Sequence, residues 1–302
     1  MKAVKNLLTL LDYSREELDE ILHLAIDMKK RWKKGKIDHC LQGKVLAMIF
    51  EKSSTRTRVS FEVAMEHLGG HAIHIESSSS QLGRGETFED TGRVLSRYVQ
   101  GIMFRTFSQV NLERMASTAS IPVINGLTDL FHPVQVLADL QTILEVKKIL
   151  KGLKITYVGD GNNLANSWIN AAIIYGFDLN LSCPSGHQPP GQILNEISSH
   201  PHIQLVEDPV EAVKSCDVLY TDTWFSMGQE VSDQKRQKFA PFQVNGELVS
   251  HGAKDVMVMH CLPAHREEEI TSEVLDGPLS YVWEEAENRL HIQKAILKTL
   301  MG

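Results

Sequence analysis

The sequence contains few cysteines and no long apolar run. Its four cysteines, Cys40, Cys183, Cys216 and Cys261, form no CxxC pair. This spacing excludes a disulfide framework and a usual zinc site, and it is typical of a protein from the reducing cytoplasm. No stretch approaches the roughly 18 apolar residues of a membrane span, and the apolar run over 7–11 is too short for a signal peptide. We therefore expect a cytoplasmic protein without a membrane segment.

Positive charge is scarcer than negative charge. The 31 lysines and arginines against 38 acidic residues give a formal net charge of −7. Nucleic acids and anionic membranes require broad positive fields, so neither is an expected partner, and any anion site has to be local. The length of 302 residues, with 42% hydrophobic and 23% charged residues, is typical of a globular protein with two domains.

Short β-rich runs alternate with longer helical patterns in two series. The first series contains KVLAMIF, HAIHI, GIMFR and IPVIN, and the second contains KITYVGD, DLNLSC, IQLVED, DVLYTD and DVMVMH. This βαβ rhythm predicts an α/β protein of two domains, each a parallel sheet flanked by helices. We expect a first domain over 1–147, joined by a C-terminal helix (284–302) that packs back on it, and a second domain over 148–283.

Polar side chains follow the predicted strands. Parallel sheets bind ligands beyond the carboxyl ends of their strands, so a cleft between two such domains is the expected active site. The stretch Lys52–Arg58 after the first strand holds three cations and four hydroxyls with no carboxylate. At a helix N-terminus this composition predicts a phosphate site, and the absence of GxxxxGK[ST] spacing favours a small phosphate compound over ATP. A Ser/Thr helix cap with surface arginines is the alternative.

Donor side chains are also predicted at the ends of the third and fourth strands of the first series. Arg105 ends GIMFR, and His132 and Gln135 lie on one face of the first turn of a helix that begins at Pro133. Such a trio could polarise a carbonyl and hold the oxyanion of a tetrahedral intermediate. The alternative for each residue alone is a histidine N-cap or a solvated amide.

Three strand ends of the second series carry candidates. GDGNN has two glycines of a dinucleotide motif, but Leu164 stands at the third position, so an amide that binds a polar substrate competes with NAD binding. Asp222 and Ser226 in TDTWFSMGQE could meet an ammonium and a carboxylate, or cap a turn. In HCLPAH, Cys261 is a packing residue, a nucleophile or a metal ligand. Neighbouring strand residues face opposite ways, so His260 and Cys261 are not expected to form a dyad.

Seven motifs occur together, namely SSTRTR, FRTF, HPVQ, GDGNN, DTWFSMG, HCLP and EAENR. As a set they resemble the aspartate/ornithine carbamoyltransferase superfamily over nearly the whole chain, and its ornithine branch more closely. The resemblance implies transfer of the carbamoyl group from carbamoyl phosphate to the δ-amine of L-ornithine, giving L-citrulline and phosphate in arginine biosynthesis, without metal or organic cofactor. It also implies a homotrimer or a multiple of trimers, with active sites at subunit interfaces. Another amine (putrescine, acetylornithine or aspartate), a catalytically idle subunit and an NAD-dependent dehydrogenase are the alternatives.

The resemblance also assigns site residues. Carbamoyl phosphate is assigned to Ser54, Thr55, Arg56, Thr57, Gln81, Arg105, His132, Gln135, Cys261, Leu262 and Arg289. Ornithine is assigned to Asn163, Asp222, Ser226 and Met227, and the catalytic residues are Arg105, His132, Cys261 and Asp222. The backbone near Leu262 would join Arg105 and His132 at the oxyanion, and Gln81 would come from a neighbouring subunit. Cys261, Asp222 and the leaving phosphate remain alternative proton acceptors. Ala264 departs from the arginine common in the family, which alters the charge near the site.

Overall fold

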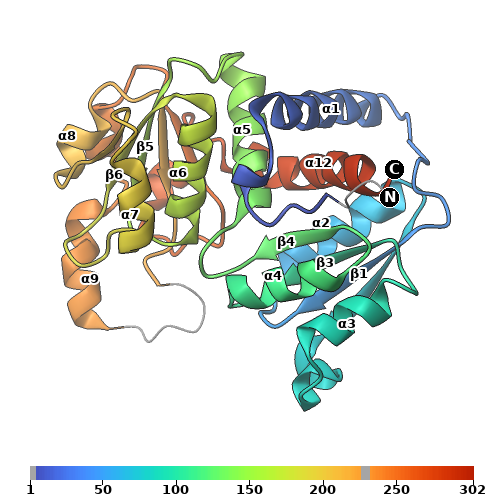
Figure 1. The fold of residues 1–302 in the computed structure, drawn as a ribbon. Coiled ribbons are helices and arrows are strands. Elements are labelled where there is room, and N and C mark those ends of the chain that lie inside the picture. Colours follow the sequence, from blue (N-terminus) through green and yellow to red (C-terminus); the bar gives the residue numbers. More distant parts are fainter. Residues whose placement is uncertain (1–4, 226–231) are drawn as a thin grey trace. The chain divides into compact units, whose positions relative to one another are not determined.

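The computed structural model describes residues 5–225 and 232–302. The chain divides into two compact units. Unit 1 comprises Met1–Gln141 and Asn288–Gly302, and unit 2 comprises Thr142–Glu287. Both changes of unit fall inside helices, which are α5 and α12 in Figure 1. No helix in the described part of the chain is long and apolar enough to cross a membrane.

Unit 1 is built on a four-stranded sheet in the order β2-β1-β3-β4, and every pairing in it is parallel. The strands are β1 (Val45–Phe50), β2 (His71–Glu76), β3 (Gly101–Arg105) and β4 (Val123–Leu127). All five residues of β3 are buried, whereas the edge strand β2 is largely exposed or half-buried. Parallel strands in the middle of a sheet are covered on both faces, which explains their continuous apolar sequences. The prediction of a parallel sheet is confirmed here.

Unit 1 also contains helices. They are α1 (Arg15–Lys33), α2 (Thr55–His67), α3 (Phe88–Leu95), α4 (Gln109–Thr118), the start of α5 (Pro133–Lys147) and the end of α12 (Val282–Met301), with 3-10 turns at Leu10–Asp12, Ser77–Ser79 and Leu82–Arg84. Lys29 of α1 donates to the side chain of Asn288 at 2.7 Å, and the Trp32 and His291 rings lie 5.5 Å apart. Helix α12 therefore packs on the N-terminal region, beside α1, as predicted (Figure 1).

Unit 2 is built on a five-stranded parallel sheet in the order β7-β6-β5-β8-β9. The strands are β5 (Lys154–Val158), β6 (Asp178–Ser182), β7 (Ile203–Leu205), β8 (Val218–Thr221) and β9 (Met257–His260). The helices are α6 (Asn163–Tyr175), α7 (Gly191–Ile197), α8 (Pro209–Val213), α9 (Asp233–Phe239), α10 (Gly246–Ser250) and α11 (Ser272–Leu275), with a 3-10 turn at Ala240–Phe242. The second predicted parallel sheet is thus confirmed.

Capping side chains begin helices directly after the strand ends. Ser54 caps α2 by accepting a hydrogen bond from Thr57 N at 3.3 Å, and Asn162 caps α6 by accepting from Leu164 N at 2.9 Å. Gly161, just before the second cap, has no room for a side chain, because an added Cβ would lie 2.3 Å from Pro189 N. Close backbone packing therefore requires a glycine at position 161, the second glycine of GDGNN.

Candidate active site

The candidate residues of unit 1 begin at the turn between β1 and α2. Ser54 is half-buried, Thr55 and Arg56 are exposed, and Thr57 is buried. The amides of the first turn and the positive end of the helix dipole lie beside these hydroxyls and this guanidinium. The turn is thus a helix cap, as the alternative held, and it also presents exposed donors of the kind that bind a phosphate.

Arg289 connects three helices beneath this turn. It lies on α12 with 6% of its surface exposed, and it donates from Nη1 to Gln135 Oε1 and from Nη2 to Thr57 Oγ1, the latter at 3.3 Å. Gln135 in turn donates from Nε2 to Asp139 Oδ1 at 2.8 Å. The predicted residues Thr57, Gln135 and Arg289 are therefore brought together, although up to 232 positions separate them in the sequence.

Arg105 and His132 lie close to Arg289. Arg105 is the last residue of β3, His132 directly precedes α5, and both are buried. Burial, followed by the positive charges of Arg289 and then Arg105, lowers the pKa of His132 well below its usual value of 6.5. The imidazole is therefore neutral at neutral pH. A neutral imidazole between two guanidinium groups can donate a hydrogen bond to a substrate oxygen without adding further positive charge.

The side chain of Gln81 faces solvent. The residue follows β2, and its backbone carbonyl accepts hydrogen bonds from Arg84 N and Glu86 N at 2.9 and 3.0 Å. Among the described residues it makes no hydrogen bond to the Ser54–Thr57 turn. Its role in the site of a neighbouring subunit stays a prediction.

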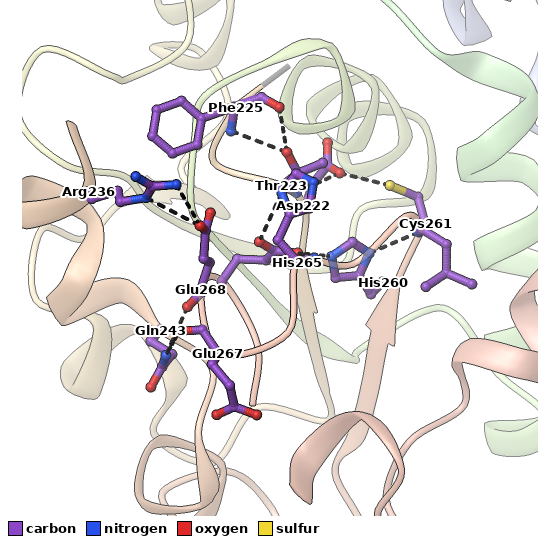
Figure 2. Close-up of polar contacts among 12 residues, drawn as sticks. Asp222, Thr223, Phe225, Arg236, Gln243, His260, Cys261, His265, Glu267 and Glu268 are labelled. Carbon is purple, nitrogen blue, oxygen red and sulfur yellow. Dashed lines mark hydrogen bonds and ion pairs between the residues drawn. The ribbon is translucent and has the colours of Figure 1, made fainter. Parts of the chain in front are cut away.

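The candidate residues of unit 2 gather around Asp222, which follows β8 and is 6% exposed. Its Oδ2 accepts from Asn162 Nδ2 at 2.7 Å, and its Oδ1 accepts from Thr223 N at 2.8 Å. The Cys261 thiol also donates to Oδ1, at 2.9 Å (Figure 2). The carboxyl ends of β5, β8 and β9 therefore meet at one carboxylate, as expected for a parallel sheet.

Asn162 is a candidate site residue that the sequence motifs did not indicate. The family resemblance implies Asn163, which is the first residue of α6 and whose carbonyl accepts from Ser167 Oγ at 2.8 Å. Asn162 is instead the side chain that contacts Asp222, and its Oδ1 also accepts from Tyr157 OH at 3.2 Å. The strong preference of asparagine for the N-cap position was the available signal. Ser226 and Met227, also assigned to ornithine, lie outside the described residues.

A second cluster lies on the other side of the GDGNN turn. Asp160 pairs with Lys235 of α9 at 3.0 Å and lies 3.5 Å from His187 Nδ1. Burial raises the pKa of Asp160, while the charge of Lys235 acts in the opposite direction. Lys235 also lies over the rings of Phe225 and Phe239, at 5.2 and 5.1 Å from their centroids. This cluster anchors α9 to the turn after β5.

His260 and the adjacent Cys261 bond to different carboxylates, Glu269 and Asp222. The ring of His260 is fully buried, and its Nε2 lies 3.0 Å from Glu269 Oε1. Its Nδ1 accepts from Leu262 N at 2.9 Å. The amide of Leu262 is therefore committed to His260 and is not available to a substrate oxyanion in this structure.

The same neighbourhood contains atoms of the kind that bind metals. One ligand atom each of Asp222, His260 and Cys261 lies within 4.8 Å of the others. Both ring nitrogens of His260 are already hydrogen-bonded, and the thiol donates to Asp222. These contacts make the cluster a hydrogen-bond network whose members hold one another in place.

Two family models match consecutive parts of the chain. The carbamoyl-P binding domain of aspartate/ornithine carbamoyltransferase matches residues 5–145, and the Asp/Orn binding domain matches residues 151–300. The chain belongs to the aspartate/ornithine carbamoyltransferase family. This membership confirms the resemblance found in the sequence and replaces the dehydrogenase alternative.

Relatives within the family bear the name ornithine carbamoyltransferase. One from Syntrophotalea carbinolica is 52% identical over 300 residues, covering 99% of each chain. One from Pyrococcus furiosus, named as anabolic, is 53% identical over 307 residues, covering 99% of this chain and 97% of its own. A solved ornithine carbamoyltransferase structure from Pyrococcus furiosus superimposes with a TM-score of 0.94 at 52% identity, covering 99% of this chain and 98% of that chain. The predicted α/β fold class is confirmed by this match.

Proposed function

We propose that the chain transfers the carbamoyl group of carbamoyl phosphate to the δ-amine of L-ornithine and releases L-citrulline and phosphate. The amine attacks the carbonyl carbon, a tetrahedral intermediate forms, and its collapse expels phosphate. A relative named anabolic at 53% identity supports the biosynthetic direction, towards arginine. The four cysteines, all in the described part of the chain, are thiols without a disulfide, which supports a reducing cytoplasm as the location.

Carbamoyl phosphate binds to unit 1 in this proposal. Its phosphate takes the first turn of α2, where Ser54, Thr55, Arg56 and Thr57 surround the helix N-terminus. Its carbonyl oxygen takes Arg105 and the neutral His132, which would stabilise the oxyanion. Gln135 and Arg289 hold the carbamoyl end, and their hydrogen bond to each other supports this role. Gln81 of a neighbouring subunit completes the phosphate contacts.

Ornithine binds to unit 2 in this proposal. Asp222 meets the ammonium end of the amino acid, and Asn163, Ser226 and Met227 bind around the α-amino and carboxylate groups. Cys261 and Leu262 lie beside the reacting δ-amine. Because Asn162 donates to Asp222 at 2.7 Å, we add it as the residue that orients this carboxylate.

Deprotonation of the amine is the main chemical demand on the site. A free alkyl amine has a pKa near 10, so only about one molecule in a thousand is neutral at pH 7. The guanidinium groups of Arg56 and Arg105 favour the neutral amine electrostatically. Asp222, Cys261 or the leaving phosphate accepts the proton, and the bond from the Cys261 thiol to Asp222 links the two protein candidates.

The observation that carries the proposal is the buried group of donors around His132, in a chain whose relatives are ornithine carbamoyltransferases over their full length. An assay of the ureido product with carbamoyl phosphate and a panel of ornithine, acetylornithine, putrescine and aspartate tests it. We expect ornithine to be preferred, with a kcat/KM on the order of 10⁴ times that for putrescine. Putrescine lacks the α-carboxylate, so it would leave polar groups of the site unpaired. A preference for any other amine, or no ureido product, would overturn the assignment.

Subunit assembly belongs to the same proposal. We expect a homotrimer or a multiple of trimers, in which each active site takes Gln81 from the neighbouring copy. The exposure of the Gln81 side chain, which leaves it accessible to another copy of the chain, supports this arrangement.

A further inference from the structure

The last residue of β9, His260, is held at three points. Its backbone amide donates to Glu285 Oε2 at 3.0 Å, its Nε2 lies 3.0 Å from Glu269 Oε1, and its Nδ1 lies 2.9 Å from Leu262 N. His260 and Glu269 are fully buried, and Glu285 is 1% exposed. Two buried carboxylates thus fix one histidine directly before the predicted substrate residues Cys261 and Leu262.

The hydrogen bonds determine the tautomer of His260. The amide of Leu262 can only donate, so Nδ1 has to accept. The single proton of the neutral ring is then on Nε2, where Glu269 Oε1 accepts it. A carboxylate that accepts from one ring nitrogen fixes the role of the other, as in metal and catalytic sites.

Leu262 needs such support because its backbone is unusual. Its φ angle is 57°, in the left-handed region that a leucine rarely adopts. Conformations of this kind persist where the surroundings impose them, and they gather at functional sites. The hydrogen bond from Leu262 N to His260 is one such constraint, and in the same turn the Cys261 thiol points to Asp222 (Figure 2).

We propose that Glu269 and His260 form a positioning pair for the ornithine side of the reaction. Glu269 holds His260 as the Nε2–H tautomer, and His260 then holds the turn of Cys261 and Leu262 in the conformation that presents the thiol and Asp222 to the substrate. Neither residue of the pair touches the reacting atoms. The consequence for ornithine rests on the proposed function, whereas the tautomer follows from the hydrogen bonds alone.

The burial of Glu269 supports a specific role over simple packing. A buried carboxylate costs free energy unless it is well hydrogen-bonded. Glu269 Oε1 also accepts from His265 N at 2.6 Å, whereas Oε2 is buried without a hydrogen bond in the described part of the chain, 4.0 Å from His265 Nδ1. An apolar side chain would fill this space at lower cost, but it could not accept the proton of His260.

Kinetics of two variants of similar size test the pair. Glu269→Met removes the acceptor, whereas Glu269→Gln keeps one oxygen that can accept from His260. We expect kcat/KM for ornithine to fall by about 10- to 100-fold in Glu269→Met and to recover to within about threefold of the wild type in Glu269→Gln. The affinity for carbamoyl phosphate, measured by calorimetry, should stay within about twofold, since only the ornithine side is displaced.

Glu268→Gln is the matched control. Glu268 is the adjacent carboxylate, but it pairs with Arg236 at 3.0 Å and makes no hydrogen bond to His260 in the described part of the chain (Figure 2). We expect it to leave ornithine kinetics unchanged. Losses of equal size in Glu268→Gln and Glu269→Met, or no loss in Glu269→Met, would overturn the proposal.

Nitrogen NMR of ¹⁵N-histidine-labelled protein supplies a readout that is independent of activity. His260→Gln identifies the signals of this residue, and the wild type should show a protonated Nε2 and an unprotonated Nδ1. Glu269→Gln should keep this tautomer, and Glu269→Met should lose it. A wild-type His260 with its proton on Nδ1 would overturn the pair even if ornithine is the substrate. If the protein makes no citrulline, only the proposed function fails, and the tautomer still decides the inference.

Discussion

At the scale of single residues, the surroundings of His132 in unit 1 change its pKa. It is buried beside Arg105 and Arg289, and these surroundings lower its pKa in the folded chain. In the unfolded chain its pKa returns to about 6.5. The folded state therefore binds no proton at this residue at a pH where the unfolded state does.

A pH dependence of stability follows from this difference. As pH falls below about 6.5, His132 should reduce the free energy of unfolding by up to about 1.4 kcal/mol per pH unit, and it should contribute no slope above that pH. His132→Asn removes the titrating group. The free energy of unfolding, measured in urea, should increase in this variant relative to the wild type by about 1 kcal/mol as pH falls from 6.5 to 5.5. Parallel pH profiles of the two proteins would show that the folded-state pKa of His132 is not lowered.

Arg105 gives the corresponding prediction for catalysis. Removal of one oxyanion donor lowers turnover by about 10²–10³, so Arg105→Ala should lose about that much in kcat while circular dichroism shows an intact fold. Arg97→Ala is a suitable control, because Arg97 lies outside the candidate site. Near-normal turnover by Arg105→Ala would remove the role assigned to this residue.

At the scale of elements, the anchoring of α9 depends on a buried ion pair. The side chains of Lys235 and Asp160 are 14% and 12% exposed. Lys235→Met would leave the Asp160 carboxylate buried without its cation, so we expect a loss of about 3 kcal/mol in the free energy of unfolding at pH 7. The pKa of Asp160 is already raised by burial, and it would rise further in the variant. The loss should therefore shrink as pH falls towards 4 and Asp160 takes up a proton in the folded state.

Lys238→Met serves as the comparison on the same helix, because Lys238 is exposed. Its unfolding midpoint in urea should match that of the wild type within error. If Lys235→Met were equally stable, or if its loss did not depend on pH, the ion pair would not anchor α9.

The elements were predictable where apolar residues repeat with a clear period. KVLAMIF, GIMFR and KITYVGD became β1, β3 and β5, because central parallel strands are buried on both faces. The helix expected to begin at Pro133 is α5. The long helix α1 was not predicted, although Ser14 and Glu17 form a capping box at its start.

Local sequence patterns could not predict the contacts between elements that are distant in the sequence. The hydrogen bond from Tyr220 to Glu285 spans 65 positions, and no period or spacing indicates it. Similarly, Glu269 appears in the sequence as one of three consecutive acidic residues, and only folding buries this one against His260. The family motifs indicated Arg289, but the way it binds Gln135 and Thr57 emerged only from the structure.

At the scale of the whole molecule, the proposed trimer makes the active site a shared one. If each site takes Arg105 from one chain and Gln81 from the next, Arg105→Ala and Gln81→Ala trimers should complement each other. When the two variants are mixed in equal amounts after mild dissociation, each mixed trimer should contain one intact site. Averaged over all random trimers, the activity should recover to roughly one quarter of the wild-type value.

Light scattering of the separate and mixed proteins checks that the oligomer stays the same. Remixing each variant with itself provides the baseline, which should remain low. A mixture no more active than its parents, with subunit exchange shown by mass-tagged chains, would place Gln81 outside the neighbouring site.

The most direct test of the account is a crystal structure with a bisubstrate mimic that joins a phosphonate to ornithine through an acetyl linker. We predict the phosphonate at the first turn of α2 beside Arg56, the carbonyl oxygen at Arg105 and His132, and the amino acid end at Asp222. A phosphonate bound remote from Arg56, or an amino acid end that does not contact Asp222, would contradict it.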